Sequence, residues 1–95
     1  MFETERSVLK NVIERIATVV GWDVPKLTYD QGTTLTAILE RAIEALDSDN
    51  TVEVCYQLQA FINLMNVLMM GGGRAKDEAI VFHSVIRRIE NELGC

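Results

Sequence analysis

Hydrophobic residues recur at three- and four-residue intervals along four separate stretches of the chain. This spacing is typical of one face of an α-helix, because each residue advances by about 100° around the helix axis. The pattern predicts helices over residues 4–20, 33–47, 50–70 and 75–93. The strict alternation of a half-buried strand is absent. We therefore expect an all-α protein, a small antiparallel four-helix bundle with a long, central third helix.

The stretch 50–70 is predicted to be central because it is apolar on two sides. Asn50 is placed to cap its start, and Glu53 has the spacing of a capping box. The glycines at 71–73 are expected to end it. Its broad apolar face is expected to enter the core and consists of Val54, Cys55, Leu58, Phe61, Ile62, Met65, Leu68 and Met69.

A second, narrower apolar line on this helix comprises Ala60, Leu64 and Val67. It lies on the wrong side to share the same core, so a monomeric bundle would leave it in water. A twofold dimer would bury it by packing the third helix on its symmetry mate. The sequence therefore predicts a homodimer, with the interface residues Ala60, Asn63, Leu64, Val67 and Met70.

The longest stretch without helical periodicity is 21–32. Pro25 disfavours helical geometry at the residue before it. One interpretation is a lid that packs over one end of the bundle. The other is a recognition loop presenting Trp22 and Tyr29, since aromatic residues are enriched at binding hot spots. The helix that follows is expected to be capped by Thr33 or Thr34.

The length of 95 residues predicts a single domain, residues 1–95. The net charge of -5 limits the classes of partner that we expect the protein to bind. A nucleic-acid binder or a protein of anionic membranes needs a positive face, so neither partner is expected. A basic protein partner is permitted. The chain shows no signal peptide and no apolar segment long enough to span a bilayer, so we expect a soluble, cytoplasmic protein.

Two cysteines are too few to indicate a disulfide framework. Cys55 lies on the broad apolar face and is expected to be a small buried hydrophobe. Cys95 is the last residue of the chain and is expected to be mobile. We expect no intramolecular pair, and a bridge between the Cys95 residues of two chains stays open.

Candidate chemistry is sparse. The one histidine, His83, has no plausible metal ligand three or four residues away, so it is expected to pack at the edge of the core. The glycine run at 71–73 lacks the Gly-Lys-Ser/Thr ending of a phosphate loop. We therefore predict no catalytic residues, no metal and no cofactor, and we expect a protein that is not an enzyme.

The segment CYQLQAFINLMN follows the pattern C-x-Q-L-x-A-F-I-N-x-x-N. A glycine connector and a second amphipathic helix come after it. From Leu35 to Leu93 the chain thereby resembles the FIVAR-like and FIMAH-like helical modules of secreted bacterial proteins. Three features depart from that pattern: the first helix and the Trp22 stretch are additional, the triple glycine is unusual, and no export signal is visible. The resemblance implies a small bacterial accessory or interaction module without catalytic residues.

Three functions are consistent with these patterns. The first is a non-enzymatic protein–protein interaction module or small regulatory adaptor, acting as a homodimer through the third helix. The second is a small acidic inhibitor of the immunity-protein or antitoxin type, which would bind a basic target. The third is a small helical enzyme or ligand binder, which would need a closed cavity with buried Arg or Lys.

Overall fold

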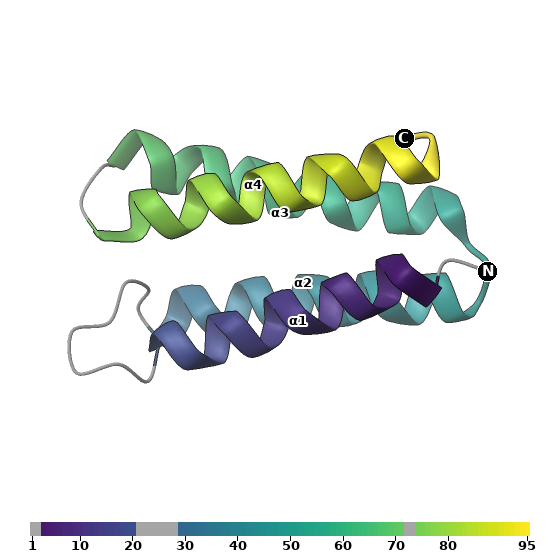
Figure 1. Ribbon diagram of the computed structural model, residues 1–95, viewed down its shortest axis with the longest axis horizontal. Coiled ribbons are helices and arrows are strands. Elements are labelled where there is room, and N and C mark those ends of the chain that lie inside the picture. Colours follow the sequence, from purple (N-terminus) through teal and green to yellow (C-terminus); the bar gives the residue numbers. More distant parts are fainter. Residues whose placement is uncertain (1–2, 21–28, 72–73) are drawn as a thin grey trace.

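The computed structural model describes residues 3–20, 29–71 and 74–95, and these form four α-helices (Figure 1). α1 spans Glu3–Val20, α2 spans Tyr29–Asp47, α3 spans Thr51–Gly71 and α4 spans Arg74–Leu93. The described residues contain no strand. The all-α prediction is confirmed, and α3, with 21 residues, is the longest helix.

Successive helices run antiparallel and pack side by side. α2 lies against α1 and α3, and α4 lies against α3. Figure 1 shows α1 and α2 forming one layer of the bundle and α3 and α4 forming the other. The connector between α2 and α3 is short, which makes the two helices antiparallel neighbours. α3 therefore packs between two helices, as its predicted central position required.

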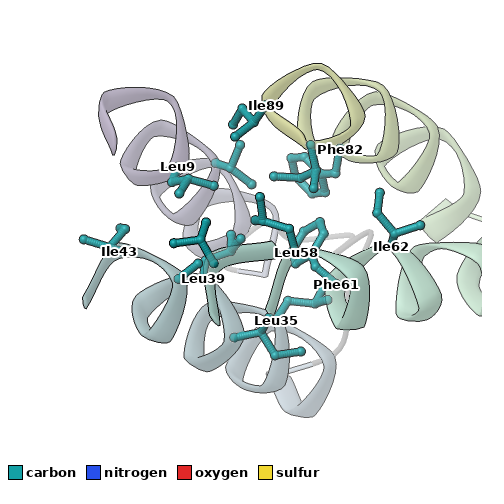
Figure 2. Packing of buried hydrophobic residues seen from close by; sticks show 14 of the residues in the cluster. Leu9, Leu35, Leu39, Ile43, Leu58, Phe61, Ile62, Phe82 and Ile89 are labelled. Atoms are coloured by element: carbon teal, nitrogen blue, oxygen red, sulfur yellow. The ribbon is translucent and has the colours of Figure 1, made fainter. Parts of the chain in front are cut away.

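Each helix contributes one apolar face to a common core. Figure 2 shows side chains from all four helices converging, with Leu58 of α3 near the middle. The rings of Phe61 and Phe82 meet edge to face, with their centroids 6.5 Å apart. Val19 and Val20 at the end of α1 lie outside the residues whose side chains are described. Among the described side chains, the buried hydrophobic residues are Leu9, Val12, Ile16, Leu35, Ile38, Leu39, Ala42, Ile43, Ala45, Leu46, Val54, Leu58, Phe61, Ile62, Met65, Ala79, Phe82, Ile86 and Ile89.

The corner between α2 and α3 is closed by backbone hydrogen bonds. Asp49 N donates to Leu46 O at 3.1 Å, and Asn50 N donates to Ala45 O at 2.9 Å. This pair of bonds is the Schellman motif that ends many helices. The motif needs a left-handed residue, and Asp49 supplies it with a φ of 56°. An aspartate here adopts a conformation that glycine adopts at lower cost.

Asp49→Gly is expected to raise the free energy of unfolding by about 0.5–1 kcal/mol, because glycine has no Cβ to strain the left-handed turn. Urea unfolding of the variant and the wild type measures the change. Ser48→Gly is the matched control: Ser48 does not have a positive φ, so glycine there is expected to destabilise. An Asp49→Gly variant no more stable than the wild type would contradict the expectation.

Asn50 caps α3 as predicted, since its Oδ1 accepts a hydrogen bond from Glu53 N at 3.2 Å. The reciprocal half of the predicted capping box does not form. The backbone N–H of Asn50 is used by α2. The Glu53 carboxylate instead accepts a hydrogen bond from Gln57 Nε2 at 2.8 Å.

α2 begins at Tyr29, earlier than the predicted start at residue 33. The prediction of an irregular stretch is therefore wrong for residues 29–32. The expected cap at Thr33 or Thr34 is wrong, because both residues lie inside α2. The Thr33 hydroxyl donates to Tyr29 O at 2.9 Å, a bond made inside a helix. Gly32 is buried within α2, so tertiary packing outweighs the poor helix propensity of glycine. Trp22 lies outside the described residues, and the choice between lid and recognition loop stays a prediction.

Cys55 and Cys95 form an intramolecular disulfide, with their Cα atoms 5.6 Å apart. The expectation of no such pair, with a mobile Cys95 and a buried Cys55 thiol, is wrong. Gly94, at a φ of 79°, turns the chain back on α4, and Cys95 N donates to Glu90 O at 2.9 Å. Because α3 and α4 are antiparallel, this places Cys95 beside the first turns of α3.

Candidate interaction surface

A line of exposed side chains follows the outer surface of α3. Successive members are separated by four, three, four, three and four residues, which averages 3.6, the repeat of an α-helix. Residues at this spacing share one face of the helix along its length. We call this set the outer line of α3; its members are Val52, Tyr56, Gln59, Asn63, Asn66 and Met70.

The outer line is apolar towards its ends and amide-rich at its centre. Val52 and Tyr56 are 82% and 69% exposed, and Met70 is 87% exposed. At the centre, Gln59 Nε2 donates to Asn63 Oδ1 at 3.1 Å. This hydrogen bond holds the two amides together on the helix surface.

Charge is nearly absent from this surface. Residues 51–71 contain a single charged side chain, that of Glu53. Interface centres are generally depleted of charged residues, and the outer line shares this depletion. Among the described side chains of the other helices, the exposed charged residues are Glu3, Lys10, Glu14 and Arg15 of α1, Asp30, Glu40, Arg41, Glu44 and Asp47 of α2, and Lys76, Asp77, Arg87, Arg88 and Glu92 of α4.

The predicted interface residues fall into two groups. Asn63, Val67 and Met70 are exposed, Asn63 and Met70 on the outer line and Val67 beside it. Ala60 and Leu64 are half-buried and pack against the core. The expectation that a monomer leaves these two in water is therefore wrong, because they lie on the side of α3 that faces the core.

Leu64 also lines a groove between α2 and α3 with a volume of about 270 Å³. The other lining residues are Asp30, Gln31, Thr34, Leu35, Val67 and Leu68. The groove is open and borders Val67. The groove therefore extends the surface centred on the outer line towards α2.

The sequence alone did not predict Val52 and Tyr56 as part of this surface. The predicted interface follows the apolar line from Ala60 to Val67, whereas the amides of Gln59 and Asn63 lie between Tyr56 and Met70 on the outer line. The helical spacing from Val52 to Met70 is visible in the sequence. The exposure of that face is not, because it depends on which face of α3 the neighbouring helices cover.

Tyr29 of the predicted recognition loop lies in the first turn of α2 and is 76% exposed. It lines a groove of about 320 Å³ between α1 and α2, together with Ile16, Ala17, Gly32, Thr33, Thr36, Ala37 and Glu40. This groove is separate from the outer line. Trp22, the other residue of the predicted loop, lies outside the described residues.

Ion pairs tie α1 to its neighbours. Arg6 Nε lies 2.9 Å from Asp47 Oδ1 at the end of α2, and Arg15 Nη2 lies 2.7 Å from Glu78 Oε1 of α4. The hydrogen bond to Glu78 raises the pKa of Arg15 above its ordinary value. These pairs join helices, and Glu78 is buried at one of them.

Glu90 is a second buried carboxylate on α4. Its Oε1 accepts no hydrogen bond from a described residue, and Arg87 Nη1 lies 3.6 Å away. The burial of both acids was not predictable from the sequence, because a glutamate on an amphipathic helix is ordinarily exposed.

The part of the chain that the structure describes contains no group of three or more His, Cys, Asp or Glu side chains that could hold a metal ion. His83 is half-buried on α4, in agreement with its predicted place at the edge of the core. Among the described helices, none has both the length and the apolar character needed to cross a membrane.

Comparison of the chain with protein-family models, curated proteins and solved structures finds no match. The resemblance to FIVAR-like and FIMAH-like modules therefore rests on the residues quoted for it. The outer line of α3 is the feature of the molecule from which a function can be argued.

Proposed function

We propose that this protein is a non-enzymatic protein–protein interaction module or small regulatory adaptor, and that it acts as a homodimer through α3. The observation that carries the proposal is the outer line, an exposed helix surface with apolar ends, central amides and almost no charge. Such a surface loses little solvation energy when another protein covers it, because no charged group has to leave water.

The apolar residues on this surface are large and lie in two clusters. Val52 and Tyr56 form one, and Val67 and Met70 form the other. Single exposed hydrophobic residues are ordinary, but a contiguous set on one helix indicates an interaction site. The resemblance to bacterial accessory modules points to the same class of function.

The inhibitor hypothesis finds less support on α3. An inhibitor of a basic target is expected to present clustered carboxylates, and Glu53 is the only acid between residues 51 and 71. Such an inhibitor would have to bind through another helix. A ligand binder or enzyme would need buried basic groups around an enclosed site, whereas Arg15 at the buried Glu78 has a side chain that is 46% exposed.

The disulfide is relevant to the cellular compartment in which the protein is located. The sequence predicted a cytoplasmic protein, but protein disulfides persist mainly in oxidising environments. We propose that the bonded form belongs to such an environment, which is also where the modules resembling residues 35–93 occur. This location leaves the role of the outer line unchanged.

Val67→Glu is expected to convert a dimeric wild type into a folded monomer, because it places a charge in the proposed interface. Val67 is 63% exposed in the single chain, so the substitution leaves the core intact. Light scattering gives the solution mass, and circular dichroism confirms that the helices remain.

Val81→Glu is the matched control, since Val81 is 54% exposed on α4, away from the outer line. It makes the same chemical change at similar exposure and is expected to stay dimeric. A monomeric wild type would show the homodimer proposal to be wrong. A dimeric Val67→Glu variant would show that the dimer uses another surface.

A further inference from the structure

We infer that the partner of the outer line is a second copy of this chain, packed antiparallel about a twofold axis, with Gln59 of each copy opposite Asn63 of the other. The inference rests on the proposed function and deepens it by fixing the orientation and register of the two α3 helices. Two features of the outer line support it: the exposed hydrophobic residues at its two ends and the hydrogen-bonding groups of its central amides.

The outer line is symmetric about residue 61. Val52 and Met70 each lie nine positions from it, Tyr56 and Asn66 each lie five, and Gln59 and Asn63 each lie two. A twofold axis through this point makes every residue of one copy face its counterpart on the other. Over 18 residue steps, at 1.5 Å rise each, the contact would run about 27 Å along the helix.

This register matches side chains of like character at the ends and at the centre of the outer line. It places Val52 of one copy against Met70 of the other, so two exposed hydrophobic residues cover each other at both ends of the contact. Tyr56 comes to lie against Asn66 and beside Val67, where its ring can cover the valine and its hydroxyl can bond the amide. Glu53, the one charged residue, lies off the line and keeps access to solvent.

The central amides are self-complementary. Gln59 Nε2 already donates to Asn63 Oδ1 within each chain. This bond leaves the Oε1 acceptor of Gln59 and the Nδ2 donor of Asn63 to be satisfied from outside. In the antiparallel register, Nδ2 of each Asn63 faces Oε1 of Gln59 on the other copy, so four hydrogen bonds close into a ring about the axis.

A parallel arrangement satisfies these groups less well. It would place the two Gln59 acceptors opposite each other, and the two Asn63 donors likewise. A central polar pair of this kind selects orientation and register in helix pairs at some cost in stability.

Cross-linking between variants that each carry one added cysteine tests the orientation of the two α3 helices. Val52→Cys and Met70→Cys proteins, each with the native Cys55–Cys95 disulfide intact and with tags of different mass, are mixed and treated with a short thiol-specific cross-linker. We expect the mixed product, 52 to 70, to dominate over the 52-to-52 and 70-to-70 products. Glu40→Cys on α2, mixed with Met70→Cys, is the control and is expected to give no enrichment.

The outcomes separate this inference from the proposed function. A dimer that cross-links 52 to 52 and 70 to 70 would overturn the antiparallel register and leave the homodimer standing. Cross-linking of position 40 at the same yield would overturn α3 as the contact. A wild type that is monomeric by light scattering would overturn both proposals.

Substitution of Gln59 and Asn63 tests the proposed ring of four hydrogen bonds. Asn63→Leu removes the inter-chain donor while leaving Gln59 in the contact, and we expect the dissociation constant to rise about fivefold to tenfold. The double variant Gln59→Leu, Asn63→Leu is expected to dimerise at least as tightly as the wild type but to give parallel cross-links as well. A double variant that keeps the wild-type cross-linking pattern would overturn the role of the amides in setting orientation.

Discussion

Replacing Cys55 with serine is expected to lower the free energy of unfolding of the oxidised protein by about 3–4 kcal/mol. The disulfide closes a loop with a sequence separation of 40 residues, and the chain-entropy cost of leaving such a loop open in the unfolded state has this size. Since a domain of this length is stable by only about 5–15 kcal/mol, the loss would be a large share of the total. Urea unfolding at fixed protein concentration measures it.

Two further proteins control for effects of the side chain itself. Cys95→Ser and the chemically reduced wild type lose the same cross-link, so both are expected to unfold at the same urea concentration as Cys55→Ser. Thiol labelling followed by mass measurement confirms that the oxidised wild type carries no reactive cysteine. Equal stability of the oxidised wild type and Cys95→Ser would show that the bond does not constrain the unfolded chain.

Phe61→Ala is expected to destabilise the protein by about 3–5 kcal/mol, the cost of truncating a fully buried aromatic ring. Phe61 is 0% exposed at the centre of α3 and meets the ring of Phe82 across the α3–α4 contact (Figure 2). The variant loses the burial of its own ring and leaves a cavity between two helices. Urea unfolding measures the effect, and loss of cooperative unfolding would indicate a molten core.

The conservative variant Phe61→Leu separates ring geometry from volume. It is expected to cost less, about 1–1.5 kcal/mol. A double-mutant cycle with Phe82→Leu is expected to give a coupling of about 0.5–1.5 kcal/mol for the edge-to-face pair. Val81→Ala, at an exposed position on α4, is the surface control and should change stability by no more than about 0.5 kcal/mol. A Phe61→Ala variant as stable as this control would contradict the assigned core.

Local periodicity was sufficient to predict much of the fold. In α2, Leu35, Ile38, Leu39, Ala42 and Ile43 recur at helical spacing, and all of them are buried. The cap at Asn50 was also predictable, because its side chain bonds an amide three residues away. These features depend on residues that are neighbours on one helix, and the sequence contains that information directly.

The candidate surface was only partly predictable. The sequence placed it on α3 and identified Asn63, Val67 and Met70, which are exposed. It also included Ala60 and Leu64, which pack against the core, and it omitted Val52 and Tyr56. Periodicity reveals which residues share a face, but the packing of α2 and α4 decides which face of α3 remains exposed.

The sequence by itself determined the number, order and apolar faces of the helices, because these depend on interactions within a few residues of chain. Only the tertiary structure decided the Cys55–Cys95 disulfide, the burial of Glu78 opposite Arg15 and the early start of α2 at Tyr29. Each of these requires knowing which helices meet and in what register. Such contacts join positions far apart in the chain, and no local pattern of residues encodes their distances.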